Sequence, residues 1–225
     1  MEIIAKIYTD FPEKFGIPRQ SGLSANLSRI VFEKKYRREA ALKGLDGYSH
    51  IWIIWQFSEL KRKDWTPTVR PPRLGGNRRM GVFATRSPYR PNPIGLSSVK
   101  LVKIEKTATE GTVLWVEGAD MLNGTPIYDI KPYLSFTDSH PDAVCGFADE
   151  ALGYTLDVVI PESIKSSLTQ EETEELTSLL SQDPRPHYKE DGDAEYGMSF
   201  KNKNVNFKVE SGIISVTNLQ NTNKT

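Results

Sequence analysis

The sequence is poor in cysteine and has no long apolar run. Cys145 is the single cysteine in 225 residues, which excludes an intrachain disulfide framework and a Cys-based metal site. The longest apolar run, residues 51–55, is far too short to span a bilayer. The first ten residues, MEIIAKIYTD, lack the basic region and apolar stretch of a signal peptide. We therefore expect a cytoplasmic protein with no membrane segment.

Several familiar catalytic signatures are also missing. Without GxGxxG, GxxxxGK[ST] or GxSxG, the chain has no motif of a Rossmann site, a P-loop or a hydrolase nucleophile elbow. His50, His140 and His187 are widely separated and lack metal-ligand spacing, so we expect no metal. Cys145, in an Ala-Val-Cys-Gly stretch, fits a small buried thiol better than a nucleophile.

Charge is balanced overall but unevenly distributed. The chain has 29 basic and 29 acidic residues. Residues 61–90 carry nine of the basic residues and one acid, whereas residues 138–195 carry fifteen acids. The basic block is rich in arginine, whose planar guanidinium suits phosphate and carboxylate groups. It therefore indicates an anion-binding surface, although a solvated face is the alternative interpretation of any such run.

The first half of the chain has the pattern of a β-rich domain. We expect strands over residues 3–8, 29–32, 48–57, 79–84, 96–104 and 112–116, a short helix over 37–43 and an irregular loop over 65–79. Many short strands with one short helix favour a closed or nearly closed barrel. The predicted fold class is therefore mainly β, with a β-barrel N-terminal domain over residues 1–148.

A smaller α+β domain is expected over residues 149–225. Residues 154–160 form a predicted strand, and Thr169 can cap a helix that reaches Leu180. Acidic residues in the first turn of that helix complement its dipole. Residues 198–209 and 212–219 are predicted to pair as a hairpin.

The most unusual stretch is dense in proline, glycine and arginine and runs from residue 65 to 101. Arg86 and Arg90 flank a Ser-Pro-Tyr turn, and Asn92 lies between two prolines that restrict the backbone on both sides. A backbone held in this way suits ligand binding. A rigid turn that only closes the barrel would explain the same residues equally well.

This stretch contains GVFATRSPYRPNPIGLS, residues 81–97, with PPRLGGN (71–77) before it and NGTPIYDIKPY (123–133) after it. Together they closely resemble the TrmO, or TsaA-like, family of tRNA N6-threonylcarbamoyladenosine N6-methyltransferases. FGIPRQSGL (15–23), GLDGYSHIWII (44–54) and SQDPRPHY (181–188) agree as well. The resemblance therefore spans both predicted domains, from about residue 3 to residue 219.

The resemblance implies a β-barrel enzyme that uses S-adenosylmethionine and forms a homodimer with the cofactor near the subunit interface. The implied substrate is threonylcarbamoyladenosine at position 37 in the tRNA anticodon stem-loop, with tRNA for threonine suggested. The implied cofactor contacts are Pro18, Arg19, Gln20, His50, Ile51, Arg86, Leu96, Asn123, Gly124, Thr125 and Pro126. The C-terminal domain could assist tRNA binding or support the dimer.

Some of these residues have structural alternatives. His50 could be a partly buried core histidine, and Arg19 could pair with a surface acid. The family usually has Asp where Asn123 stands, and Asn keeps the acceptor oxygen and the turn preference but loses the charge.

The acceptor nitrogen also needs help from the protein. Its lone pair is delocalised into the carbamoyl group, so it must lose its proton during or before methyl transfer. Asp129 and Tyr89 are the candidate catalytic residues. We expect one of Arg70, Arg73 and Arg90 to bind the threonyl carboxylate through two hydrogen bonds. Other basic residues would contact phosphates.

Two alternative functions are consistent with the sequence. One is a non-catalytic RNA-binding barrel, which would bind tRNA without a cofactor. The other is a methyltransferase of the same fold that acts on a different acceptor, which would be active on tRNA lacking the threonylcarbamoyl group.

Overall fold

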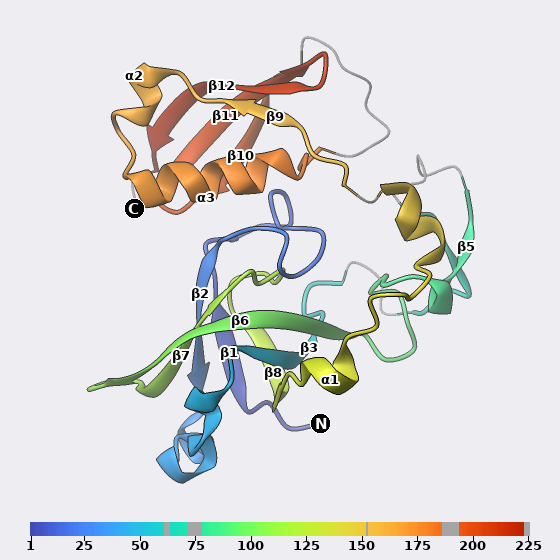
Figure 1. The fold of residues 1–225 in the computed structure, drawn as a ribbon, viewed down its shortest axis with the longest axis vertical. Helices are drawn as coiled ribbons and strands as arrows, with labels where there is room; N and C mark the ends of the chain where they lie inside the picture. The colour runs from blue at the N-terminus through green and yellow to red at the C-terminus, as the bar shows by residue number, and fades with distance from the viewer. Residues whose placement is uncertain (61–63, 72–77, 152, 186–193, 223–225) are drawn as a thin grey trace.

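The lower part of the molecule in Figure 1 is a closed β-barrel with strand order β1-β2-β7-β6-β3-β8. A computed structural model describes the chain except for residues 61–63, 72–77, 152, 186–193 and 223–225. The barrel strands are β1 (Ala5–Tyr8), β2 (Leu27–Phe32), β3 (His50–Gln56), β6 (Ile94–Thr107), β7 (Gly111–Glu117) and β8 (Thr125–Pro132). Neighbouring strands are antiparallel. The predicted barrel is confirmed.

Buried and partly covered side chains alternate along the strands, and the buried ones fill the barrel. In β3, Ile51, Ile53 and Trp55 are buried, whereas Trp52 and Ile54 between them are only partly covered. Successive side chains of a strand point to opposite faces, so the first set enters the core. The same alternation supplies inward side chains from the other strands, namely Ala5, Ile7, Ile30, Phe32, Val99, Leu114, Val116 and Ile127.

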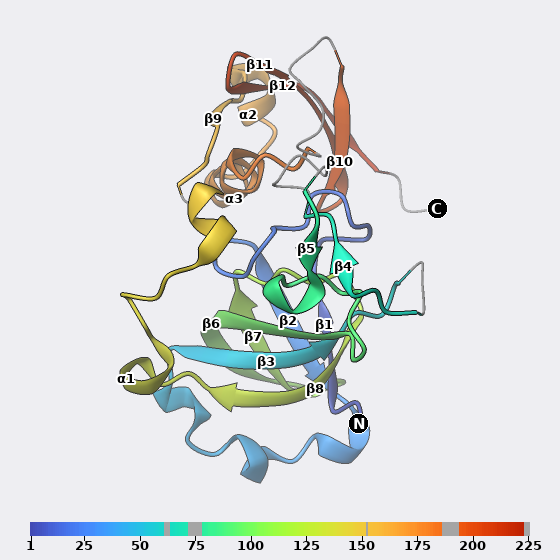
Figure 2. The same cartoon turned by 90° about the vertical axis from the view of Figure 1, so that its right-hand side faces the viewer.

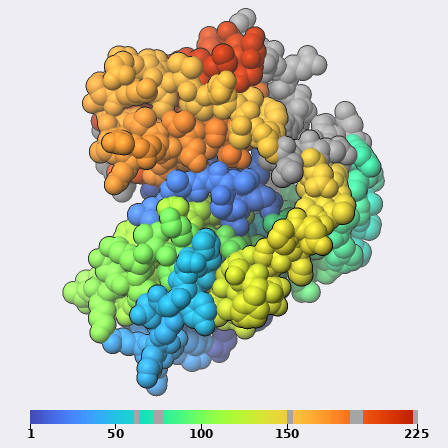
Figure 3. All heavy atoms as spheres, viewed as in Figure 1, coloured from blue at the N-terminus to red at the C-terminus, as the bar shows by residue number. Residues whose placement is uncertain are grey.

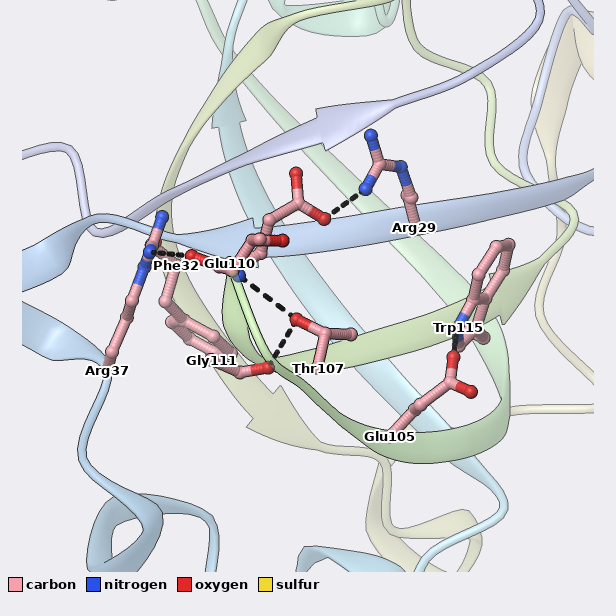
Figure 4. A network of polar contacts seen from close by, with 9 residues as sticks. Arg29, Phe32, Arg37, Glu105, Thr107, Glu110, Gly111 and Trp115 are labelled. Atoms are coloured by element: carbon pink, nitrogen blue, oxygen red, sulfur yellow. Dashed lines mark hydrogen bonds and ion pairs between the residues drawn. The ribbon is translucent and has the colours of Figure 1, made fainter.

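The far end of the β6–β7 hairpin is held by polar contacts (Figure 4). Arg29 of β2 forms an ion pair with Glu110 in the hairpin turn. Trp115 Nε1 donates to the Glu105 carboxylate at 2.6 Å, and the Thr107 hydroxyl donates to the Gly111 carbonyl at 3.0 Å. These contacts fix the end of β6 that lies farthest from Ile94, where the strand begins.

The C-terminal unit is a four-stranded sheet with order β10-β11-β12-β9 and helices on one face (Figures 1 and 2). Its elements are β9 (Asp157–Val159), α2 (Glu162–Lys165), α3 (Gln170–Ser181), β10 (Tyr196–Phe200), β11 (Lys203–Glu210) and β12 (Ile213–Asn221). Strand β9 runs parallel to β12, and the other pairs are antiparallel. This arrangement confirms the predicted small α+β fold.

Helix α3 begins as the sequence predicts. The Thr169 hydroxyl accepts the Glu172 N–H at 3.1 Å, and the Glu172 carboxylate accepts the Thr169 N–H at 3.1 Å. Each group therefore satisfies an N–H that has no partner within the helix. The buried face of α3 carries Leu176, Leu179 and Leu180.

A loop from the first half of the chain enters the core of the C-terminal unit. Phe11 is buried in the same cluster as Leu176 and Met198, and Phe15 and Ile17 pack against that cluster. In Figures 1 and 3 this blue segment lies between the C-terminal unit and the barrel strands. Residues 18–20, which follow directly, are therefore positioned by both parts of the molecule.

The two parts are also joined by a connecting segment, drawn in yellow in Figures 1 and 2. It contains α1 (Ser135–Asp138) and the 3-10 helix η6 (Gly146–Ala151). Cys145 in this segment is exposed, so the expectation of a buried thiol was wrong. The segment runs along the outside of the molecule, where no core surrounds the thiol.

The remaining elements are short. Two of them, together with the pair β10 and β11, differ from what the sequence predicted. The short elements are η1 (Lys34–Tyr36), η2 (Glu39–Leu42), η3 (Leu45–Gly47), β4 (Thr68–Val69), β5 (Met80–Gly81) and η5 (Val82–Ala84). The predicted helix over 37–43 is only the 3-10 turn η2, which buries no residue. The predicted strand over 79–84 is β5 followed by η5. The predicted long strand over 198–209 is two strands, which separate at Lys201 with φ +53°.

None of the helices in the described part of the chain is both long and apolar enough to span a bilayer.

Candidate functional site

The main cleft opens where the beginning of β6 meets the segments 17–20 and 85–90. Its volume is about 630 Å³, which is within the range of small-molecule sites. One wall is apolar and includes Trp52, Trp55, Phe57, Ile94, Leu96 and Leu122. The charged and amide side chains in its lining are Lys14, Arg19, Gln20, Glu59, Arg86, Arg90 and Asp120.

A second hollow, the side cleft, shares a wall with the main cleft. Trp52, Arg86 and Leu96 line both. The side cleft has a volume of about 400 Å³ and is also lined by Ser21, His50, Ser98, Tyr133 and Asp138. The rings of Trp52 and Tyr133 are 5.5 Å apart between centroids. The side cleft therefore offers aromatic surface beside the charge of Arg86.

Asp138 fixes the tryptophan that separates the two clefts. Its carboxylate accepts the Leu134 N–H at 3.0 Å and the Trp52 Nε1–H at 2.8 Å. These two hydrogen bonds lower the pKa of Asp138, in that order of importance. The Trp52 indole is thus held by an ionised carboxylate.

Most of the residues implied as cofactor contacts meet at these clefts. Pro18, Arg19, Gln20, Arg86, Leu96 and Thr125 line the main cleft, and His50 lines the side cleft. Arg86 Nη1 donates to Gln20 Oε1, which joins two segments that are 66 residues apart. His50 is exposed at the start of β3 and does not enter the barrel core.

Ile51 and most of the Asn123–Pro126 turn lie elsewhere. The Ile51 side chain is fully buried in the barrel core, so only its main chain could meet a ligand. Asn123 Oδ1 accepts the Thr9 N–H at 3.1 Å, and Gly124, with φ +79°, donates its N–H to the Ile7 carbonyl at 2.8 Å. Pro126 pairs with Lys6 across β8 and β1. The turn fastens the end of β1 and requires only an acceptor oxygen from Asn123.

Arg19 forms hydrogen bonds with the main chain of the C-terminal unit. Its Nη2 donates to the carbonyl oxygens of Asp183 at 2.6 Å and Arg185 at 3.0 Å. Residues 181–188 were among the stretches that carry the family resemblance. Their described part therefore supports the wall of the main cleft, and residues 186–188 lie outside the described chain.

Asp183 organises this contact. Arg185 donates through Nε to Asp183 Oδ1 at 2.9 Å and through Nη2 to Oδ2 at 3.1 Å, and the Tyr154 hydroxyl donates to Oδ2 at 2.9 Å. Burial acts to raise the pKa of Asp183, but the hydrogen bonds from Arg185 and Tyr154 outweigh it and the pKa is lowered. The carboxylate is ionised and buried with its partners.

The arginines expected to bind the threonyl carboxylate differ in their surroundings. Arg90 lines the main cleft, and its Nη1 donates to the carbonyl oxygens of Thr85 at 2.7 Å and Val82 at 3.3 Å. Arg90 therefore also holds its own loop in shape. Arg70 is exposed just after β4. Arg73 lies outside the described residues.

The two candidate catalytic residues are also separated. Tyr89 lines the main cleft. Asp129 lies on β8, where its carboxylate accepts the Ile130 N–H at 2.9 Å and pairs with Lys131 at 3.4 Å. Asp129 is not among the residues that line either cleft.

Asp120 is an acidic residue of the main cleft that the sequence did not single out. Its Oδ1 accepts the Ser97 hydroxyl at 2.6 Å, and Ser97 Oγ accepts the Trp55 Nε1–H at 2.9 Å. Burial raises the pKa of Asp120 against the opposing effects of the Ser97 hydrogen bond and the Arg86 charge. The available signal was a single acid between the apolar Ala119 and Met121.

In the described part of the chain, no cluster of three or more His, Cys, Asp or Glu residues could hold a metal ion.

Comparison with known proteins identifies the fold as that of a β-barrel tRNA methyltransferase. Residues 6–139 match the family model described as the tRNA-methyltransferase O N-terminal domain, and residues 154–222 match the TrmO C-terminal domain. The chain belongs to the TrmO family.

Individual relatives agree over nearly the whole chain. A tRNA (adenine(37)-N6)-methyltransferase of Escherichia coli strain K12 is 41% identical over 218 residues, which cover 92% of each chain. A Pseudomonas aeruginosa protein named as a putative S-adenosylmethionine-dependent methyltransferase is 41% identical over 194 residues, covering 82% of this chain and 81% of the relative. The crystal structure of TrmO from P. aeruginosa superposes with a TM-score of 0.77 at 32% identity, covering 97% of this chain and 95% of that one.

Proposed function

We propose that the protein transfers a methyl group from S-adenosylmethionine to N6 of threonylcarbamoyladenosine at position 37 of tRNA. The product is N6-methyl-N6-threonylcarbamoyladenosine, and tRNA for threonine is the proposed substrate. The observation that carries the proposal is the meeting of residues 18–20, Arg86 and Leu96 at one cleft. These segments are far apart in the sequence, and the E. coli relative is named for the same atom of the same nucleotide.

The main cleft has the chemistry that this cofactor needs. Its apolar wall, which includes Trp55, Phe57 and Leu96, suits an adenine ring, and Arg19 and Arg86 can pair with a carboxylate. When bound, the cofactor supplies a methyl group on a positively charged sulfur, which is a good leaving group.

The side cleft is the proposed place for the adenine that is methylated. Proteins that read single-stranded RNA commonly stack its unstacked bases on aromatic side chains. His50, Trp52 and Tyr133 provide three such rings, and Trp52 also lines the main cleft. Arg86 stands between the two clefts and can fix the relative positions of both partners. Correct relative position is a large part of the rate acceleration in a transfer reaction.

The threonyl carboxylate is assigned to one of the arginines predicted from the sequence. Arg90 is the one that lines the main cleft, and Arg70 and Arg73 belong to the same basic block. A guanidinium can form two parallel hydrogen bonds to a carboxylate, which an ammonium cannot reproduce. Such a contact would select adenosines that already carry the threonylcarbamoyl group.

Location, assembly, RNA contacts and the roles of the two domains complete the proposal. The protein acts in the cytoplasm as a homodimer and binds the anticodon stem-loop, with the basic residues of 61–90 near RNA phosphates. The barrel domain over 1–148 holds the chemistry. The domain over 149–225 supports the cleft and the tRNA.

The decisive experiment uses methyl-labelled S-adenosylmethionine and two pools of tRNA, one with and one without threonylcarbamoyladenosine. Nucleoside mass spectrometry should locate the label only in the modified nucleoside of the first pool. Label in the second pool would indicate a methyltransferase with a different acceptor. A protein that binds tRNA but does not bind the cofactor would instead be an RNA-binding barrel.

A further inference from the structure

Asp120 is held in one orientation inside the main cleft. Ser97, on β6, donates its hydroxyl hydrogen to Asp120 Oδ1 at 2.6 Å. Trp55, on β3, donates its Nε1–H to the same Ser97 oxygen at 2.9 Å, and both side chains are buried. The Ser97 hydroxyl must therefore direct its single hydrogen toward Asp120. Two barrel strands thus fix the carboxylate, which makes it a rigid group in the cleft.

Burial makes Asp120 a carboxylate that can take up a proton. The Ser97 hydrogen bond lowers the pKa of Asp120, and the charge of Arg86, on the segment after η5, lowers it by a smaller amount. Burial outweighs both and raises the pKa above 3.8. The other charged side chains that line the cleft are Lys14, Arg19, Glu59 and Arg90. A carboxylate with a raised pKa is a stronger base than one on the surface.

The proposed reaction requires such a base. The acceptor N6 carries one hydrogen, and its lone pair is shared with the adjacent carbamoyl carbonyl. Methylation without proton loss would leave a positive charge on a nitrogen of this kind. A group that removes the hydrogen returns electron density to nitrogen, and a positioned base of this type contributes on the order of 10²–10⁴-fold to a rate.

We propose that Asp120 is the catalytic base that accepts the N6 proton of the modified adenosine, and that Ser97 is its positioning residue. The adenine lies in the side cleft, and its N6 reaches the main cleft, which Asp120 lines, at the wall of Trp52, Arg86 and Leu96 that the two clefts share. This inference rests on the proposed function. The N6–H bond breaks, its electron pair stays on nitrogen, and an O–H bond forms on Asp120. The nitrogen pair forms the new N–C bond, while the electrons of the S–C bond remain on sulfur as a neutral thioether. Charge and atoms balance with a protonated Asp120 as the second product.

The test compares Asp120→Asn with wild type and with Asp46→Asn, a control at an exposed carboxylate in η3. Asn has nearly the same shape as Asp but cannot accept this proton. Single-turnover methylation of tRNA bearing threonylcarbamoyladenosine should fall at least about 100-fold in Asp120→Asn and stay unchanged in the control. Binding of S-adenosylmethionine, measured by calorimetry, should change less than about threefold, because a base for N6 is not needed to hold the cofactor.

A pH profile distinguishes a base from a merely structural acid. The wild-type rate should rise with pH through one protonation step, and Asp120→Asn should lack that step. Because the Ser97 hydrogen bond lowers the pKa of Asp120, Ser97→Ala should move the step to higher pH. Titration of the Asp120 carboxyl by ¹³C NMR, in protein without RNA, should show the same shift.

Three results would overturn the assignment. Asp120→Asn could methylate within threefold of wild type, or it could lose cofactor binding and regain the full rate at saturating cofactor. Ser97→Ala could also leave both the profile and the NMR titration unmoved, a result that counts even if Asp120→Asn does not fold. Wild-type protein that never labels threonylcarbamoyladenosine would instead refute the proposed function itself, before any variant is compared.

Discussion

The guanidinium of Arg19 donates a hydrogen bond to the main-chain carbonyl of Asp183, with an N···O distance of 2.6 Å. The two residues are 164 positions apart in the sequence. Arg19 belongs to the wall of the main cleft, and Asp183 follows α3 in the C-terminal unit. The shape of the cleft therefore depends on the correct placement of both parts.

Arg19→Met should remove the hydrogen bonds to the C-terminal unit and destabilise the wall of the main cleft. Methionine keeps much of the apolar stem but leaves the carbonyls of Asp183 and Arg185 without their donor. Hydrogen bonds from charged groups contribute about 1.5–3 kcal/mol, so the free energy of unfolding should fall by about that amount. Urea denaturation gives the change, and hydrogen exchange should show faster exchange over residues 181–185. Arg38→Met, at an exposed arginine, is the control. Equal stability and unchanged exchange in Arg19→Met would show that the contact is dispensable.

Asp183 makes stability depend on pH. Burial opposes ionisation, but the hydrogen bonds from Arg185 and Tyr154 leave the folded pKa below the ordinary 3.8. A group with a lowered folded pKa stabilises the protein above its unfolded pKa and loses that contribution as pH falls through the folded value. Asp183→Asn should therefore lose about 3 kcal/mol at pH 7, as expected when one partner of a buried pair is removed.

The difference between Asp183→Asn and wild type should shrink as the pH is lowered below about 4. Urea denaturation across this range measures it, with Asp142→Asn as the control at an exposed acid. A difference that stays constant with pH would mean that the Asp183 carboxylate is not the source of the stability.

Gly95→Ala should displace the Trp55 indole, which lines the main cleft. A Cβ at this position would lie 2.1 Å from Trp55 Cε2, so the indole must move. Its displacement breaks the Trp55–Ser97 hydrogen bond, and overpacking of this kind costs about 1–3 kcal/mol. The Trp55 indole N–H resonance should shift in NMR spectra. Gly47→Ala, where no atom lies near the added carbon, is the matched control. An unmoved Trp55 resonance would contradict the prediction.

Arg→Lys substitutions test the proposed carboxylate contact. At the correct one of Arg70, Arg73 and Arg90, lysine keeps the charge but loses the paired hydrogen bonds. Loss of one charged hydrogen bond should lower kcat/KM for threonylcarbamoyladenosine in tRNA by about 10- to 100-fold. Arg38→Lys serves as the control. Full activity in all three variants would eliminate this binding mode.

The barrel and α3 were predictable because their signals are local. Alternation of apolar and less buried residues in β3 indicates its two faces. Thr169 together with Glu172, three positions later, marks the start of α3. Strand β8 was not predicted, since Pro126 and Pro132 give the segment 125–132 the composition of a turn. The break between β10 and β11 falls at Lys201-Asn202, which contains neither glycine nor proline. Strand ends of that kind are decided by pairing with distant strands.

The site was only partly predictable for the same reason. Arg86 and the segment 18–20 carry recognisable motifs, so the family resemblance found them. Asp120 has no motif of its own, and its importance comes from Ser97 and Trp55, which only the barrel brings to it. The carbonyl groups of Asp183 and Arg185 that accept from Arg19 were likewise beyond reach, because any residue could supply a main-chain carbonyl.

The burial of Phe11 in the C-terminal core has a consequence for biosynthesis. Phe11 leaves the ribosome long before Met198, Phe207 and Val216, which belong to the same core. Domains usually fold in order as the chain grows. Here, however, the loop that carries Phe11 can pack only after strands β10, β11 and β12 have been synthesised. A truncated product could close its barrel and still lack a finished cleft. Prematurely terminated chains should therefore be unable to compete for cofactor.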